Sequence, residues 1–298
     1  MLFDRQKHLL ALLSALGGRI GNLDFQKLLL LYCTTESQPA PYEFVPYKFG
    51  AFSFTSYADR RRLIEKGLLA NDDHIWELTA VGTEQAGRLR VAKDAAARFA
   101  YAHRDLRGDA LVAETYRRYP YYAIRSEIAE RVLHDDQAAL SAVAGAVPPK
   151  GAVRLATIGY EGKTLEAYLN TLLHAGVTLL CDVRRNPLSR KYGFSKGTLS
   201  KGCAGVGIKY EHLPELGIES DKRKSLETQA DYDALFVEYV RDTLPAQAAA
   251  LERVRGWIRD GEAVALTCYE RLPTQCHRHC VSDALADVLG PGITPTHL

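Results

Sequence analysis

Hydrophobic residues in the first part of the chain recur at the helical period of about 3.6 residues. Two stretches show this spacing, at residues 9–16 and 23–31, and each predicts an amphipathic helix. Prolines and tyrosines then break the pattern at residues 39–50. Because proline removes a backbone donor and restricts its neighbours, this stretch cannot be a regular helix, and we expect it to be a connector.

The pattern resumes at residues 56–67, which predict a helix ended by Gly67. A polar turn and a short strand at residues 75–78 follow, and Thr79 is placed to cap another helix. This order of helix, turn, strand and helix resembles a winged helix. The stretch 23–69 also resembles the small helical Panacea domains found in antitoxins.

Three consecutive arginines, Arg60, Arg61 and Arg62, lie in the helix predicted at residues 56–67. In a winged-helix-like domain such a helix faces a DNA groove or phosphates, which makes the three arginines candidate nucleic-acid contacts. The alternative is a solvated helix face on a domain that binds only a protein partner, because runs of charge are usually solvated.

Residues 80–145 keep a helical pattern, and residues 147–151 form the clearest linker in the chain. After it, short apolar strands alternate with helices, which predicts a mostly parallel sheet with helices on its faces. The predicted organisation has three parts: a winged-helix-like domain at 1–90, a helical connector and linker at 91–150, and a Rossmann-like α/β domain at 151–298.

The composition fits an ordinary globular protein: 298 residues with 38 basic and 36 acidic side chains exclude a disordered chain or a coiled coil. No apolar run approaches the roughly 18–20 residues of a membrane helix, so no membrane partner is expected. The six cysteines are unevenly spread and no signal-peptide pattern opens the chain. We therefore expect reduced thiols in a cytoplasmic protein.

Positive charge is concentrated in one stretch. Residues 183–210 hold no Asp or Glu and seven basic side chains: Arg184, Arg185, Arg190, Lys191, Lys196, Lys201 and Lys209. Tyr192 and Phe194 lie among them, and cations mixed with aromatic rings are typical of sites for single-stranded or flipped nucleotides. The pattern favours nucleic acid, with DNA preferred, over the alternative of a loop that closes on a small nucleotide or another anion.

Polar residues follow each predicted strand of the α/β region. They are residues 159–162, 182–187, 211–212, and 268–270 with 276–280. Ligands of open parallel sheets bind outside the carboxyl ends of the strands. The four segments are therefore expected to meet at one edge of the sheet and to form the site.

Several of these segments carry an ordered set of motifs that resembles the family catalogued as domain of unknown function 488. The motifs are Thr157-Ile-Gly-Tyr160, Asp182-Val-Arg-Arg-Asn-Pro187 with Ser189, Phe194-Ser195, Tyr210 with Leu216-Gly217, and Cys268-Tyr-Glu270 followed by Cys276-His-Arg278. The resemblance covers residues 153–290. It implies the fold, the site and a loose association with DNA repair or defence, but no reaction. Candidate ligand-binding residues are Gly159, Tyr160, Arg185, Pro187, Ser189, Lys191, Ser195, Lys196, Cys268 and Arg278.

Two carboxylates are the candidate acid and base. Asp182 follows an apolar strand, where Arg184 would hold it ionised, and Glu270 is the second. If both share one cleft, their pKa values should be driven apart. With Arg184 and Arg278 as phosphate or oxyanion clamps, the set suits glycosidic or phosphodiester chemistry. The alternative is an Asp182–Arg184 pair that only fixes the loop behind it.

Cys276 and His277 are the remaining catalytic candidates. We expect Cys276 to open the last helix, at residues 276–289, where the helix dipole would lower a thiol pKa and favour anions. Adjacent residues on a helix point about 100° apart, so His277 is poorly placed to activate Cys276. Binding of a phosphate by His277, Arg278 and the helix start is therefore favoured over a cysteine nucleophile.

The cysteine spacing does not favour zinc. Cys268 and Cys276 are separated by seven residues and lack a second close pair, although Cys276 and Cys280 at i and i+4 are an alternative pair on one helix face. We therefore predict no metal and, because no cofactor motif is visible, no cofactor. The sequence predicts a hydrolase-type enzyme that acts on nucleic acid or a nucleotide. The alternative is a non-enzymatic regulator or sensor whose α/β domain holds a nucleotide-like effector while the N-terminal domain binds DNA or a protein partner.

Overall fold

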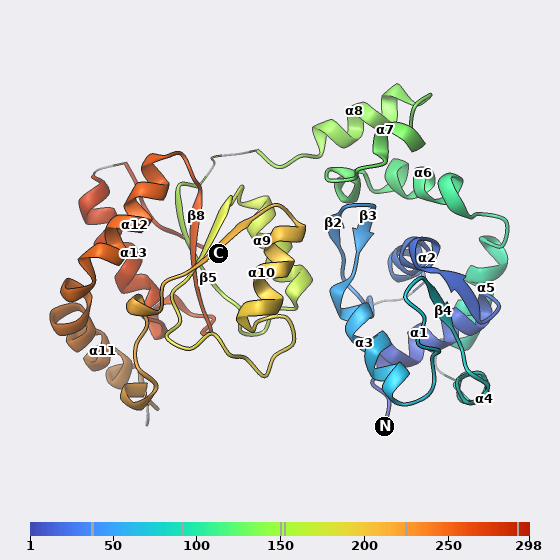
Figure 1. Ribbon diagram of the computed structural model, residues 1–298, viewed down its shortest axis with the longest axis horizontal. Coiled ribbons are helices and arrows are strands. Elements are labelled where there is room, and N and C mark those ends of the chain that lie inside the picture. Colours follow the sequence, from blue (N-terminus) through green and yellow to red (C-terminus); the bar gives the residue numbers. More distant parts are fainter. Residues whose placement is uncertain (37–38, 91, 150, 152, 224–225, 291) are drawn as a thin grey trace. The chain divides into compact units, whose positions relative to one another are not determined.

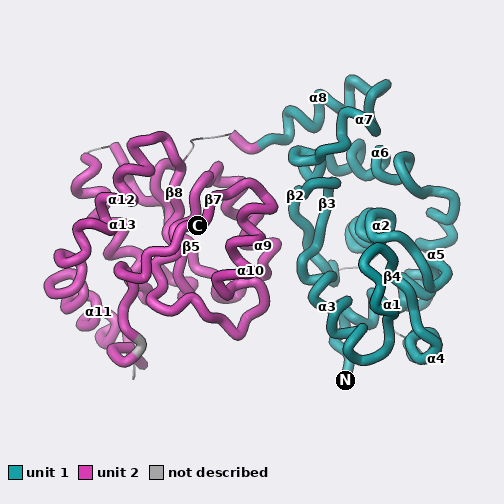
Figure 2. Tube along the Cα trace, viewed as in Figure 1, with its two compact units in different colours: residues 1–147 teal, residues 148–298 magenta. Residues whose placement is uncertain are grey.

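The chain divides into two compact units, Met1–Val147 and Pro148–Leu298, in a computed structural model (Figure 2). The structure describes residues 1–36, 39–90, 92–149, 151, 153–223, 226–290 and 292–298. Val91, where the predicted connector begins, and Lys150, in the predicted linker, lie outside the described residues. None of the helices within the described ranges has the length and apolar character needed to cross a membrane.

The first unit is mostly helical, as predicted (Figure 1). Its opening elements are α1 (Asp4–Ala15), β1 (Arg19–Gly21), α2 (Asn22–Thr35), α3 (Phe54–Glu65), β4 (Ile75–Glu77) and α4 (Ala80–Gly87). The predicted cap at Thr79 is confirmed, because its side-chain oxygen accepts a hydrogen bond from the backbone N–H of Gly82 at 3.0 Å. Strand β4 pairs antiparallel with β1, and an isolated bridge joins Leu69 to Leu78.

Residues 39–50 contain no helix, as their prolines predict, and their second half enters a hairpin. Strands β2 (Val45–Tyr47) and β3 (Gly50–Phe52) pair antiparallel in a two-stranded sheet. Pro46 is tolerated there because both strands of an isolated pair are edges. Gly50 has a φ of +88° and faces the ring of Tyr116, so no side chain fits at this position.

The remaining elements of the first unit are α5 (Lys93–Ala102), α6 (Gly108–Arg118), the 3₁₀ turn η1 (Pro120–Ala123), α7 (Ala129–Val132) and α8 (Gln137–Gly145). Residues 80–145 are thus largely helical, as their pattern predicts. Pro120 does not kink a continuous helix: α6 ends before it and η1 begins with it. The main core of the unit includes Phe25 and Trp76, whose rings lie 4.4 Å apart.

Lys27 in α2 is buried, and its Nζ donates a hydrogen bond to the carbonyl oxygen of Ala51 at 3.1 Å. Burial lowers its pKa from the usual 10.5 to about 7. Between these two values the unfolded chain binds more protons than the folded one, so stability should rise with pH across this window by up to about 1.4 kcal/mol per unit. Urea unfolding from pH 7 to 10 should show that Lys27→Met removes this rise. Parallel curves for wild type and variant would contradict the assignment.

The second unit contains a five-stranded, wholly parallel sheet in the order β7-β6-β8-β5-β9. The strands are β5 (Leu155–Gly159), β6 (Leu179–Asp182), β7 (Lys209–His212), β8 (Val264–Cys268) and β9 (Thr296–His297). The three central strands are buried along their whole length, as expected of a sheet covered on both faces. The predicted α/β class and parallel sheet are therefore confirmed.

The described residues of the second unit include five α-helices. They are α9 (Leu165–His174), α10 (Lys196–Gly205), α11 (Gln229–Glu238), α12 (Ala248–Arg259) and α13 (Arg278–Leu289). Figure 1 shows α9 and α10 on one side of the sheet and α12 and α13 on the other. The chain passes from α11 to α12 through a π-helical turn (Tyr239–Thr243) and a 3₁₀ turn (Leu244–Gln247).

Register places the carboxyl ends of the central strands at one edge, as predicted. Gly159 pairs with Cys268, and Asp182 lies beside both His212 and Thr267. The predicted start of the last helix is wrong, because α13 begins at Arg278. Pro273 opens a separate 3₁₀ turn, η6 (Pro273–Gln275), and Cys276 closes it in an extended conformation.

Candidate functional site

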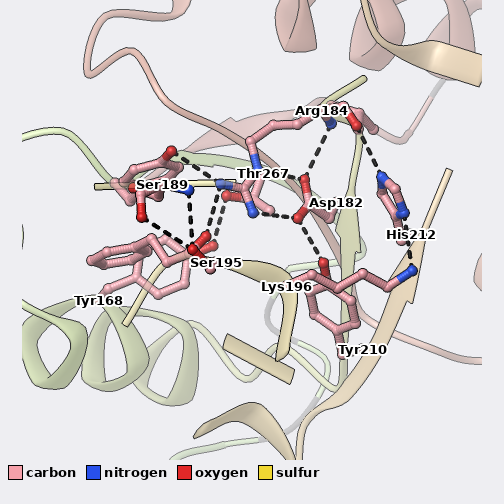
Figure 3. Close-up of polar contacts among 12 residues, drawn as sticks. Tyr168, Asp182, Arg184, Ser189, Ser195, Lys196, Tyr210, His212 and Thr267 are labelled. Carbon is pink, nitrogen blue, oxygen red and sulfur yellow. Dashed lines mark hydrogen bonds and ion pairs between the residues drawn. The ribbon is translucent and has the colours of Figure 1, made fainter. Parts of the chain in front are cut away.

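Asp182, at the carboxyl end of β6, is fully buried, and both of its carboxylate oxygens accept hydrogen bonds (Figure 3). Oδ1 accepts from the backbone N–H of Arg184 at 3.1 Å and from its Nε at 2.8 Å. Oδ2 accepts from Arg184 Nη2 at 2.5 Å and from the Tyr210 hydroxyl at 2.7 Å. The predicted Asp182–Arg184 pair is therefore present, and four donors surround this carboxylate.

Arg184 joins three segments at the carboxyl edge. Besides its bonds to Asp182, its Nη1 donates to the Tyr160 hydroxyl at 3.0 Å and to the carbonyl oxygen of Phe194 at 2.9 Å. Four of its five guanidinium N–H groups are thus used within the protein. Burial opposes its charge, but the hydrogen bonds and charge of Asp182 raise the pKa of Arg184 above its usual value. The geometry fits an anchor for the loop better than a clamp on a ligand.

Tyr210 keeps its proton in this arrangement. Burial, together with the negative charge of Asp182, raises the pKa of its hydroxyl above the usual value, so it remains a donor. On the same strand, His212 Nε2 lies 2.9 Å from the carbonyl oxygen of Arg184. Because a carbonyl only accepts, Nε2 carries the proton, and Nδ1 accepts from Lys196 Nζ at 3.2 Å. These contacts hold β7 against the loop that follows β6.

The loop after Arg184 is packed and hydrogen-bonded. The ring of Phe194 stacks on Tyr160 with centroids 4.4 Å apart. The Ser195 hydroxyl accepts from the backbone N–H of Ser189 at 3.0 Å and donates to its carbonyl oxygen at 3.1 Å. Pro187 accepts from the backbone N–H of Lys196 at 2.9 Å. The candidate ligand residues Tyr160, Pro187, Ser189 and Ser195 therefore shape the loop.

Three cations of this loop are exposed, and we call them the basic rim: Arg185, Arg190 and Lys196. Arg185 lies 3.7 Å from Glu219, an acid from the segment after β7. Lys191 is half-buried, donates to the carbonyl oxygen of Tyr160 at 3.1 Å, and has its pKa lowered by burial. The predicted positive stretch thus contains two kinds of cation: some are exposed to solvent, and others form hydrogen bonds that hold the loop in place.

Gly159 ends β5 where two loops of the edge meet. A Cβ at this position would overlap the backbone carbonyl of Glu270. We expect Gly159→Ala to force the loops apart and to destabilise the second unit by about 1–3 kcal/mol, as overpacking does. Thermal unfolding should show this loss. Gly197→Ala is the matched control: Gly197 is exposed and helical with open space around it, so its variant should be neutral or slightly more stable.

A second group of polar residues lies at the end of the neighbouring strand β8. Cys268 Sγ donates to Glu270 Oε2 at 3.3 Å and lies 3.9 Å from His277 Nδ1. His277 Nε2 contacts the carbonyl oxygen of Val183 at 3.0 Å, next to Asp182. Glu270 is half-buried and, with Cys276 and His277, borders a cavity of about 10 Å³. The two candidate carboxylates, Asp182 and Glu270, thus lie at the carboxyl ends of two adjacent strands.

Cys276 does not have the environment that the sequence predicts. It precedes the helix instead of opening it, and burial raises the pKa of its thiol well above the usual value. Burial opposes a charge on His277, whereas its hydrogen bond with Cys276 and the charge of Cys276 raise the imidazole pKa. The predicted lowering of the Cys276 pKa by the helix dipole is therefore wrong.

Arg278 is fully buried, contrary to the expectation of a phosphate clamp. Its guanidinium donates to the Thr157 hydroxyl at 3.3 Å and to the carbonyl oxygens of Glu270 at 2.6 Å and Arg271 at 3.0 Å. It therefore fixes the loop that presents Glu270. Its charge satisfies backbone acceptors that would otherwise be buried alone.

The three arginines of the first unit differ in exposure. Arg60 is buried against the ring of Trp76 at 5.2 Å, and it donates to the carbonyl oxygens of Ile75, at 2.9 Å, and Asp72. It does not face solvent, contrary to the expectation for a nucleic-acid contact. Arg61 and Arg62 are exposed on the same helix, α3.

The sequence placed Tyr210 in a family motif and His212 among the polar residues at the end of a strand, but it did not indicate their contacts with Asp182 and Arg184. Their spacing of two on a strand, which puts both side chains on one face, was the available signal. Thr267 was missed entirely. It accepts a hydrogen bond from the buried Tyr168 hydroxyl at 2.7 Å, and an apolar strand gives no sign of such a bond.

The second unit is thus a parallel α/β domain with its polar residues gathered at the carboxyl edge. Residues 164–285 match the profile of a family described as "Domain of unknown function DUF488", so this segment is a DUF488 domain, as the motifs indicate. No curated protein sequence matches the chain. The N-terminal unit is helical, and its resemblance to winged-helix and Panacea domains stays a prediction.

Proposed function

We propose that the second unit binds nucleic acid, preferentially single-stranded DNA, at the carboxyl edge of its sheet. The observation that carries the proposal is the basic rim: three exposed cations at residues 185–196, within a longer stretch of 28 residues without an acid. They extend from a loop that the buried Asp182–Arg184 pair holds in place. A fixed row of cations suits the repeated phosphates of a polynucleotide, and the counterions it releases favour binding.

An exposed aromatic ring at the same edge supports unpaired bases as the other half of the ligand. Tyr269, which follows β8, is 44% exposed, and its ring packs edge-on against Tyr160 at 5.3 Å. Stacking on such a ring requires a base that is not already stacked in a duplex, and it tolerates any base. We therefore expect single strands to bind more tightly than duplexes and with little base preference.

The test is a binding measurement with wild-type protein. Fluorescence anisotropy of labelled single-stranded DNA, single-stranded RNA and duplex DNA should be followed at several salt concentrations. We expect single-stranded DNA to bind and the logarithm of its affinity to fall linearly with the logarithm of salt concentration. Absence of binding at low salt, or an affinity that salt leaves unchanged, would overturn the proposal.

A second candidate is cleavage of the bound strand, at a phosphodiester or a glycosidic bond, with Glu270 as the acid or base. The observation that favours it is the position of Glu270: half-buried, beside a small cavity and next to the strand that carries Asp182. We assign Asp182 a positioning role, because its two oxygens already accept four hydrogen bonds. The raised pKa of Cys276 disfavours a thiolate nucleophile.

Mass spectrometry of single-stranded DNA incubated with the protein tests this second candidate. If Glu270 transfers the proton, Glu270→Gln should stop product formation while leaving the anisotropy titration unchanged. Product formation by Glu270→Gln at the wild-type rate would remove Glu270 from the reaction. If wild-type protein forms no product although it binds, the domain is a binding module.

A further inference from the structure

Three buried side chains with metal-binding atoms meet behind the carboxyl edge of β8. The Sγ atoms of Cys268 and Cys276 and a ring nitrogen of His277 all lie within 4.8 Å of one another. Neither thiol is in a disulfide. The group is assembled from two segments, the end of β8 and the residues just before α13. The sequence predicts no metal because seven residues separate the cysteines, a spacing outside the short pairs that mark structural zinc sites.

The hydrogen bond on the far side of the imidazole sets its metal-binding nitrogen. His277 Nε2 contacts the carbonyl oxygen of Val183 at 3.0 Å, so Nε2 must carry a proton. The neutral ring then has its lone pair on Nδ1, the atom that lies 3.9 Å from Cys268 Sγ. Histidines that bind metals usually donate the other ring N–H to a carbonyl or carboxylate in this way.

We propose that Cys268, Cys276 and His277 bind a Zn²⁺ ion, with a water molecule as the fourth ligand. In a tetrahedral site with zinc bonds of about 2.0–2.3 Å, neighbouring ligand atoms lie about 3.3–3.8 Å apart. The distance of 3.9 Å between Cys268 Sγ and His277 Nδ1 is close to this value. Two thiolates and an imidazole are a donor set that selects zinc over magnesium or calcium.

Glu270 lies beside the fourth position, which a water molecule can occupy. Its Oε2 lies 3.3 Å from Cys268 Sγ, and Arg278 holds the carbonyl oxygen of the same residue at 2.6 Å. The cavity of about 10 Å³ beside Glu270, Cys276 and His277 is about the size of one water molecule. Water there would occupy the fourth position with the Glu270 carboxylate beside it, so a variant at Glu270 should keep the metal.

Binding exchanges protons for the metal. The thiols of Cys268 and Cys276 each lose a proton to solvent and form a bond to zinc through sulfur, with no change of oxidation state. His277 binds through Nδ1 and keeps the proton on Nε2. The site does not rest on the proposed binding of nucleic acid, since none of the residues of the basic rim belongs to it.

The test uses the full chain, purified under reducing conditions. Elemental analysis should find one zinc per chain. After removal of the metal with a chelator, titration with Co²⁺ should give thiolate-to-metal charge-transfer absorption and the visible bands of tetrahedral cobalt. Cys268→Ser, Cys276→Ser and His277→Gln should each lose the one-to-one metal. Cys203→Ser, which removes another buried thiol of the same unit, should keep both the metal and the spectrum. Glu270→Gln should keep the metal and the cobalt–thiolate absorption, because Glu270 is not one of the ligands.

A measurement on the wild type guards against variants that fail to fold. Zinc added to the metal-free chain should release at least two protons, read with a pH indicator, and should raise the midpoint of thermal unfolding until one equivalent is bound. Absence of zinc together with absence of a cobalt–thiolate band would overturn the proposal. So would equal metal binding by Cys276→Ser and the wild type, or a disulfide between Cys268 and Cys276 in the reduced preparation.

Discussion

Replacing Asp182 by alanine should destabilise the second unit by about 3–5 kcal/mol. The carboxylate is fully buried and forms a two-point ion pair with Arg184, which is only 6% exposed. Removing one member of such a pair leaves the other charge buried without compensation, and this cost exceeds the net value of the intact pair. The backbone N–H of Arg184 and the hydroxyl of Tyr210 lose an acceptor as well.

Hydrogen exchange followed by mass spectrometry measures this loss, because it resolves peptides of the second unit from those of the first. Asp233→Ala is the matched control, since Asp233 is exposed on α11 and its removal should change stability by less than about 0.5 kcal/mol. A double variant, Asp182→Leu with Arg184→Met, should recover much of the stability because it leaves no unpaired charge. Equal exchange in the Asp182 and Asp233 variants would show that the pair does not anchor the edge.

Neutralising the basic rim should cause the largest loss of nucleic-acid binding. In the variant Arg185→Gln, Arg190→Gln and Lys196→Gln, three phosphate contacts disappear together. Each contact contributes about 0.7–0.9 to the slope of log affinity against log salt, so the slope should become flatter by about 2–3. Affinity at low salt should fall correspondingly. Anisotropy titrations at four or more salt concentrations give both quantities.

The matched control removes the same amount of charge from elsewhere in the second unit. Arg241, Arg255 and Arg259 lie on the turn before α12 or on α12 itself, and each is paired with a nearby acid. Their replacement by glutamine lowers the net charge equally and should leave the slope within about one unit of the wild type. If the two triple variants bind alike, net charge accounts for the interaction and the rim has no special role.

The sheet of the second unit could be predicted because its signals are local and repeated. Short apolar runs such as residues 179–181 and 264–267 are buried on both faces, and the helices between them are amphipathic. Parallel pairing then places the carboxyl ends of all the strands at the same edge of the sheet, independently of the conformation of the loops. This is why Asp182, Glu270 and His277 could be assigned to one edge before their contacts were known.

What each side chain does at that edge could not be predicted, because it depends on partners far away in the chain. Arg278 looked like a clamp, yet it is occupied by the carbonyl oxygens of residues 270 and 271. Cys276 looked like a helix start, yet Pro273 opens a separate turn before it. Arg60 was expected to be exposed, either to nucleic acid or to solvent, yet it packs against Trp76. Charge and spacing are properties of the sequence and can be read along the chain. The burial and the hydrogen-bond partners of a side chain depend on tertiary contacts, which the sequence pattern does not give.

The location of bound DNA is the most direct test of the account. Single-stranded DNA should be cross-linked to the wild-type chain by ultraviolet light, and the modified peptides identified by mass spectrometry. The account predicts cross-links in the loop between residues 185 and 196 and at Tyr269, and their loss in the triple variant of the basic rim. Cross-links confined to the first unit, for example at peptides that contain Arg61 and Arg62, would contradict it.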